Sequence, residues 1–133
     1  MNPLSYVVDT DWVIDHLNEK RLVRDRLEQA RLKGLAMSVV SLAELWEGVH
    51  YSRDFNKSQQ QLEEFLQGTS LLTITAETCM IFGKLRGDLR SKGRSIPDFD
   101  LMIASTALEH GLTLLSNNRR HFENIPGLRL ESV

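Results

Sequence analysis

Four acidic residues stand beside apolar segments, where carboxylates seldom serve packing. Asp9 directly follows the apolar run 6–8, Glu44 lies in an amphipathic stretch, and Asp98 and Asp100 open another apolar stretch. A carboxylate in such a place is costly to desolvate unless a positive charge compensates it. Hard oxygen ligands suit Mg²⁺ or Mn²⁺, and one or two such ions activate water and stabilise charge on a phosphate. The acidic pattern therefore predicts metal-dependent hydrolysis of a phosphodiester.

Short apolar runs alternate with amphipathic stretches of helical length along the chain. Continuous apolar runs are typical of buried parallel strands, which must be connected by crossovers that are usually helices. The alternation predicts an α/β fold with a parallel sheet and helices on both of its faces. Strands are expected at residues 5–8, 36–40, 71–75, 113–115 and 128–130.

This order of elements also predicts where the acids meet. Ligands of parallel sheets bind outside the carboxyl ends of the strands. Asp9 ends the first strand and Glu44 lies in the first turns after the second. The helix expected at 98–110 leads into the fourth strand, which Ser116 follows. We therefore expect side chains from distant segments to meet at one rim of the sheet.

Length and composition predict one domain spanning residues 1–133, because a chain of this size with 41% apolar residues can bury a core without disulfides. There is no apolar run of the roughly 18 residues that a membrane span needs, and no secretory signal precedes the first strand. A cytoplasmic location is expected. Cys79 is expected to pack in the core, because Ile81 and Phe82 lie in the same helical pattern.

Four ordered blocks span nearly the whole chain: residues 7–11 (VVDTD), 41–45 (SLAEL) with Gly48, 100–104 (DLMIA) and 116–122 (SNNRRHF). Together they resemble the PIN-domain ribonucleases, and within that family the VapC toxins of bacterial toxin–antitoxin pairs. The resemblance implies a three-layer α/β/α fold whose central parallel sheet has the strand order 3-2-1-4-5.

The resemblance also implies which residues form the site. Asp9, Glu44 and Asp100 would be the core metal-binding acids. We expect Asp9 and Asp100 to bind the ion directly, and Glu44 to act through a water or to orient the attacking water. Supporting roles are expected for an accessory acid, Asp98, and for residues that hydrogen-bond to the carboxylates, namely Thr10, Ser116 and Asn118.

Members of the family often carry an acid in the fourth block, where this chain has Asn118 and His121. The fourth ligand and the number of ions, one or two, therefore stay open. His121 is a secondary site candidate, with a surface or phosphate-contacting position as its ordinary role.

RNA contact is expected from basic side chains that bracket the third and fourth blocks, because phosphate contacts give affinity without sequence choice. A solvated helix face explains some of them equally well. The resemblance implies a structured RNA substrate such as tRNA or rRNA, inhibition of translation, a VapB-like antitoxin partner and a homodimer. The candidate contacts are Arg86, Arg90, Arg94, Arg119 and Arg120.

Other interpretations of the same residues compete with this one. The segment from Asp9 to Asp11 also resembles the haloacid-dehalogenase-like phosphatases, in which the first Asp is a covalent nucleophile. A non-catalytic interaction domain with a vestigial site is a third possibility. Locally, one of the pair Asp98 and Asp100 is expected to cap its helix, and residues 41–44 fit a capping box.

Overall fold

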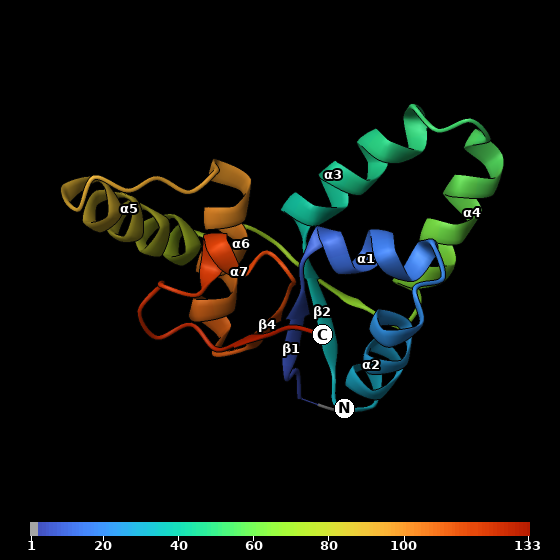
Figure 1. The fold of residues 1–133 in the computed structure, drawn as a ribbon, viewed down its shortest axis with the longest axis horizontal. Helices are drawn as coiled ribbons and strands as arrows, with labels where there is room; N and C mark the ends of the chain where they lie inside the picture. Colours follow the sequence, from blue (N-terminus) through green and yellow to red (C-terminus); the bar gives the residue numbers. More distant parts are fainter. Residues whose placement is uncertain (1–2) are drawn as a thin grey trace.

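The computed structural model describes residues 3–133, and its centre is a five-stranded parallel sheet. The strand order is β3-β2-β1-β4-β5, and helices cover both faces of the sheet (Figure 1). These features confirm the predicted α/β/α fold and the strand order that the family resemblance implied. The strands are β1 (Tyr6–Val8), β2 (Leu35–Ser38), β3 (Ser70–Leu72), β4 (Thr113–Leu115) and β5 (Leu130–Glu131).

Helices connect the parallel strands. In Figure 1, the first four lie on one side of the sheet and the last three on the other. Within the described part of the chain, none of them combines the length and apolar character that crossing a membrane requires. They are α1 (Thr10–Leu17), α2 (Arg21–Leu32), α3 (Val39–His50), α4 (Phe55–Leu66), α5 (Ala76–Ser91), α6 (Asp98–His110) and α7 (Arg119–Phe122).

The central strand β1 lies between two separate cores, because alternate residues of a strand point to opposite faces. Val8 belongs to the same buried cluster as Trp12 of α1, whereas Val7 belongs to the cluster of Ile103 in α6 and Phe122 in α7. None of these five side chains is more than 1% exposed. The carboxyl end of β1 is therefore held from both sides.

Gly34 sets the alignment of β1 with β2. Its φ is +97°, and a Cβ at this position would stand 2.2 Å from the carbonyl oxygen of Pro3. The Gly34 carbonyl accepts hydrogen bonds from the backbone of Ser5 (2.9 Å) and Tyr6 (3.1 Å). Only glycine allows both the left-handed backbone and this close approach.

The structure corrects three predicted boundaries around α3 and α6. The second strand ends at Ser38 instead of residue 40, because the Ser38 hydroxyl accepts the Val40 N–H (3.1 Å) and caps α3. The predicted capping box at residues 41–44 is wrong, since Ser41 is buried inside the helix. The N-cap of α6 is Pro97, so neither of the two acids that follow it caps the helix with its side chain.

The prediction that Cys79 packs in the core is also wrong, because this side chain is exposed. Thr78 takes the buried position instead. It forms a capping box with Thr75, and its hydroxyl donates to the carboxylate of Glu109 in α6. These bonds set the rotation of α5 about its axis. They also explain why the third strand stops before Thr75, which belongs to the helix cap.

Candidate active site

Asp9 is the first residue after β1 and the N-cap of α1. Its Oδ1 accepts a 2.8 Å hydrogen bond from the backbone N–H of Thr10, and its Oδ2 accepts a 2.7 Å bond from the hydroxyl of Ser116. Only 2% of Asp9 is exposed. The two hydrogen bonds orient the carboxylate but bring no positive charge to offset its burial.

Thr10 links Glu44 to the same place. The Thr10 hydroxyl donates a 2.7 Å hydrogen bond to Oε1 of Glu44, which comes from the second turn of α3 and is half-buried. Thr10 therefore contacts the Asp9 carboxylate through its backbone and the Glu44 carboxylate through its side chain. One residue thus joins acids that are contributed by different elements.

Asp100 lies in the first turn of α6 and pairs with His121 of α7. Nδ1 of His121 is 2.6 Å from Oδ2 of Asp100. The fourth sequence block therefore reaches Asp100 through a histidine, as it reaches Asp9 through Ser116. Asn118, the other candidate in that block, has an exposed side chain and donates its backbone N–H to the Ser116 hydroxyl at 3.0 Å.

The carboxylates of Asp9, Glu44 and Asp100, which we call the acidic rim, influence one another electrostatically. Burial is the main cause that raises the pKa of both Asp9 and Glu44, and the negative charge of Asp100 raises each of them further. Hydrogen bonds from Ser116 and Thr10 oppose these shifts in part. The charge of Asp100 therefore links it electrostatically to both of the other acids. Among the residues that the structure describes, no lysine or arginine forms an ion pair with a carboxylate of the rim.

Asp11 was quoted within the first block but not proposed as a site residue, and the structure places it beside Asp9. Burial, followed by the charge of Asp9, raises the pKa of Asp11 to about 7. Its Oδ2 accepts the Asn117 N–H (3.0 Å), while its Oδ1 is buried and accepts no hydrogen bond from the residues that the structure describes. The sequence feature that could have identified Asp11 as a site residue is its position two residues after Asp9, in the first turn of the helix that follows β1.

Other predicted site residues form no hydrogen bond or ion pair with the acidic rim in the described part of the chain. Asp98 is exposed and forms an ion pair with Arg86. Arg119 forms an ion pair with Glu123, the C-cap of α7, at 3.7 Å, so its positive charge is partly compensated. Arg120 is exposed.

The residues of the rim fit a hard divalent cation. The atoms that would bind the ion are carboxylate oxygens. The buried Oδ1 of Asp11, which accepts no hydrogen bond from the described residues, is a further carboxylate oxygen close to Asp9. Among residues 3–133, no group of three or more acidic, histidine or cysteine side chains is arranged so that it could hold a metal ion. A group of three is not required, because Mg²⁺ keeps several of its waters and commonly binds proteins through one or two carboxylates.

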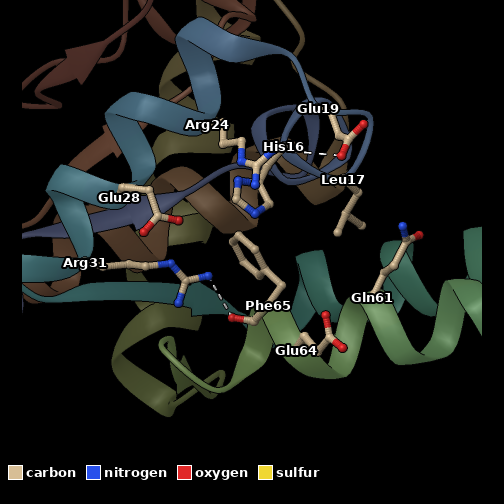
Figure 2. A pocket seen from close by; sticks show the side chains of 9 residues that line it. All are labelled: His16, Leu17, Glu19, Arg24, Glu28, Arg31, Gln61, Glu64 and Phe65. Atoms are coloured by element: carbon tan, nitrogen blue, oxygen red, sulfur yellow. Dashed lines mark hydrogen bonds and ion pairs between the residues drawn. The ribbon is translucent and has the colours of Figure 1, made fainter.

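A separate pocket of about 360 Å³ lies at the other end of α1, between α1, α2 and α4 (Figure 2). The rings of His16 and Phe65 meet there edge to face with centroids 5.1 Å apart, and Arg31 donates a 2.9 Å hydrogen bond to the Phe65 carbonyl. Burial is the main cause that lowers the pKa of His16. None of the acids of the rim lines this pocket.

Comparisons with known proteins identify the family of this chain. The chain matches the PIN domain family over residues 6–128. It is similar to ribonuclease VapC2 of Rickettsia felis, at 37% identity over 131 residues that cover 97% of this chain and 98% of that protein. It is 33% identical to the tRNA(fMet)-specific endonuclease VapC of Shigella flexneri over 129 residues, 96% of this chain and 97% of that protein.

A solved structure is similar over the same extent. VapBC2 from Rickettsia felis, bound to a DNA fragment from its promoter, contains a chain that matches with a TM-score of 0.90 and 32% identity, covering 96% of this chain and 98% of that one. A match over nearly the full length excludes the haloacid-dehalogenase-like interpretation, which belongs to a different family. The chain belongs to the PIN-domain family and, within it, to the VapC ribonucleases.

Proposed function

We propose that this protein is an endoribonuclease that uses one or two Mg²⁺ or Mn²⁺ ions to hydrolyse phosphodiester bonds of structured RNA. The observation that carries this proposal is the gathering of Asp9, Glu44 and Asp100 at the carboxyl end of β1, with the pKa of Asp9 and of Glu44 raised. Uncompensated carboxylates of this kind favour a divalent cation, which removes their mutual repulsion.

The residues of the rim take different parts in this proposal. Asp9 and Asp100 hold the ion, and Glu44 binds it through a water or orients the attacking water. The bound ion supplies a water of lowered pKa and stabilises charge on the phosphate. Ser116 keeps the Asp9 carboxylate oriented, and His121 does the same for Asp100. Thr10 and the backbone of Asn118 support these contacts, and Asp98 remains an accessory acid.

The substrate class rests on the relatives. One of them is named a tRNA(fMet)-specific endonuclease, which supports a tRNA, or another structured RNA such as rRNA, as the substrate here. Cleavage of either RNA would inhibit translation, and both are found in the cytoplasm, where we place the protein.

A VapB-like antitoxin is the proposed partner, and the similarity to the VapBC2 structure supports it. A groove of about 180 Å³ between α1, α3 and α4 is lined by Ile14, Leu17, Leu45 and Val49 and reaches Glu44. Ile14 is 46% exposed. An apolar antitoxin segment in this groove would bring a neighbouring basic side chain to the acidic rim. Size-exclusion chromatography with and without the product of the adjacent reading frame tests both this complex and the proposed homodimer.

Cleavage mapping on total RNA tests the nuclease itself. Wild-type protein with Mg²⁺ should cut a small set of RNAs, and chelation or Asp9→Asn should stop it. Asp25→Asn, which removes an exposed acid from α2, is the control and should cut normally. If the wild type cuts no RNA under any divalent ion, the interpretation as a non-catalytic interaction domain replaces the proposal.

A further inference from the structure

Three arginines line one small pocket at the first turn of α6, the helix that carries Asp100 of the acidic rim. The pocket has a volume of about 120 Å³ and lies between the C-terminal half of α5, the turn after it and the first turn of α6. Arg86 and Arg90 reach it from the helix, and Arg94 and Ser95 from the turn. We call it the arginine pocket. Its polar lining consists only of guanidinium groups and one hydroxyl-bearing residue, with no carboxylate among the residues that line it.

The positive charge of the arginine pocket is only partly balanced. Arg86 forms an ion pair with Asp98, and its guanidinium lies 5.5 Å from the centre of the Phe82 ring. Arg90 and Arg94 form no ion pair with any residue from 3 to 133. In a chain with a formal net charge of −2, this concentration of uncompensated positive charge attracts anions locally.

Backbone hydrogen bonds hold the turn that carries Arg94. The N–H of Lys92 donates to the Leu89 carbonyl (3.0 Å), that of Gly93 to the Arg90 carbonyl (3.0 Å), and that of Arg94 again to Leu89 (2.9 Å). Gly93 makes this reversal possible with a φ of +68°. The turn therefore folds back onto the helix and holds Arg94 beside Arg90 instead of leaving it on a free loop.

The pocket adjoins the acidic rim through the first turn of α6. Leu101, part of the pocket lining, directly follows Asp100 in the chain, and Asp98 of the same turn is the ion-pair partner of Arg86. The first turn of α6 thus carries Asp100 of the acidic rim together with Leu101, which lines the pocket, and Asp98, which pairs with Arg86. An RNA strand with one phosphate at the acidic rim would carry its neighbouring phosphates past this turn.

We propose that the arginine pocket binds a backbone phosphate of the RNA that flanks the cleaved one. This proposal rests on the proposed nuclease function and adds a second contact point for the substrate. Guanidinium groups bind phosphate oxygens through paired hydrogen bonds, and the Ser95 hydroxyl offers a further donor. A phosphate contact positions the strand in the site without reading its sequence.

The test measures RNA binding separately from cleavage. A fluorescently labelled tRNA is titrated in chelator with Asp9→Asn protein at several salt concentrations. The variant Arg90→Gln with Arg94→Gln is then added to this background, and Arg86 is left in place because it pairs with Asp98. The matched control removes the same charge with Arg21→Gln and Lys33→Gln, at the first residue and the C-cap of α2, which lies on the opposite side of the molecule from α5 in Figure 1. Thermal melting checks that every variant is folded.

The pocket variant should bind the tRNA roughly tenfold more weakly at low salt. Its slope of log affinity against log salt should become shallower by about 0.7 to 0.9, the change expected for one lost phosphate contact. The control should keep the slope of its parent. At constant ionic strength, inorganic phosphate should displace the tRNA more effectively than chloride does, and the pocket variant should lose this difference.

Equal slopes for the pocket variant and the control would overturn the proposal. That result would not affect the nuclease, whose failure would appear instead as intact RNA in the wild-type cleavage assay. If phosphate competes but the slope for tRNA is unchanged, the pocket binds only a free oxyanion and the RNA contact is wrong.

Discussion

Ser116 donates a 2.7 Å hydrogen bond to Oδ2 of Asp9, although 107 positions separate the two residues in the chain. The sheet explains this contact, because Val8 of β1 is in register with Leu115 of β4. The residue that follows each of these strands therefore stands beside the other. The first and fourth sequence blocks thus form one unit, and a change in either should affect the same carboxylate.

Ser116→Ala should lower kcat/KM for RNA by about 10- to 100-fold, the usual cost of removing a residue that orients a metal-binding group. The matched control is Ser105→Ala, since Ser105 is also fully buried and donates a 2.7 Å hydrogen bond, to the Leu101 carbonyl. Both variants should lose similar stability in urea unfolding. Equal activity in the two variants would mean that Ser116 is only a structural hydroxyl.

Asp9→Asn and Asp100→Asn should each abolish cleavage and yet stabilise the metal-free protein. The reason is that the negative charge of Asp100 raises the pKa of Asp9, so neutralising either residue removes repulsion from the folded state. A gain of about 1 kcal/mol would raise Tm by roughly 2–6 °C in a chain of this size. Calorimetry in chelator measures the gain, and added Mg²⁺ should stabilise the wild type more than either variant. Variants that melt below the wild type in chelator would instead give these acids a structural role.

The stability of the metal-free protein should fall as pH rises through the acid range. The folded-state pKa of Asp11 is raised to about 7 from an ordinary value of 3.8, so between these values the folded state binds a proton that the unfolded state has lost. The free energy of unfolding therefore decreases from about pH 4 to about pH 7. Urea titrations in chelator measure this fall.

Asp11→Asn should flatten the pH dependence, whereas Asp25→Asn on the exposed face of α2 should leave it as it is. A wild-type protein whose stability rises between pH 5 and pH 7 would contradict the sign of this prediction.

His121→Ala should raise the Mg²⁺ concentration that gives half-maximal cleavage by about 10- to 100-fold, because Asp100 loses the partner that stands 2.6 Å from its carboxylate. His110→Ala removes an exposed histidine from the end of α6 and should leave the Mg²⁺ dependence unchanged. Excess Mg²⁺ should restore most of the kcat of His121→Ala. A variant with an unchanged Mg²⁺ requirement would show that the histidine does not support the ion site.

Gly34→Ala should lower the free energy of unfolding by about 2 kcal/mol or more. The added Cβ would meet the Pro3 carbonyl oxygen at 2.2 Å and would occupy a backbone with φ of +97°. Gly87→Ala is the opposite case, because a Cβ there meets no atom within 4 Å and the residue lies inside α5. It should raise the free energy of unfolding by about 0.5–1 kcal/mol. Urea unfolding of the two variants beside the wild type measures both effects.

The sequence alone was sufficient for the fold class and for the family. Alternating apolar runs and amphipathic stretches indicate parallel strands joined by helices. The four ordered blocks identified the family resemblance, and the resemblance implied the strand order. The sequence was also sufficient to propose the acids of the rim. A carboxylate such as Asp9 at the end of an apolar strand has few structural explanations, and the carboxyl ends of parallel strands meet at one edge.

Only the tertiary structure decided the contacts between those residues. Whether His121 faces Asp100, whether Asp11 is buried beside Asp9, and whether Arg90 and Arg94 share a pocket all depend on how helices rotate against the sheet. Helix rotation is set by packing and by caps such as Thr75, and several rotations leave the apolar pattern equally satisfied. The exposed Cys79 shows the same limit, because a helical pattern identifies a helix without determining which of its faces the rest of the molecule covers.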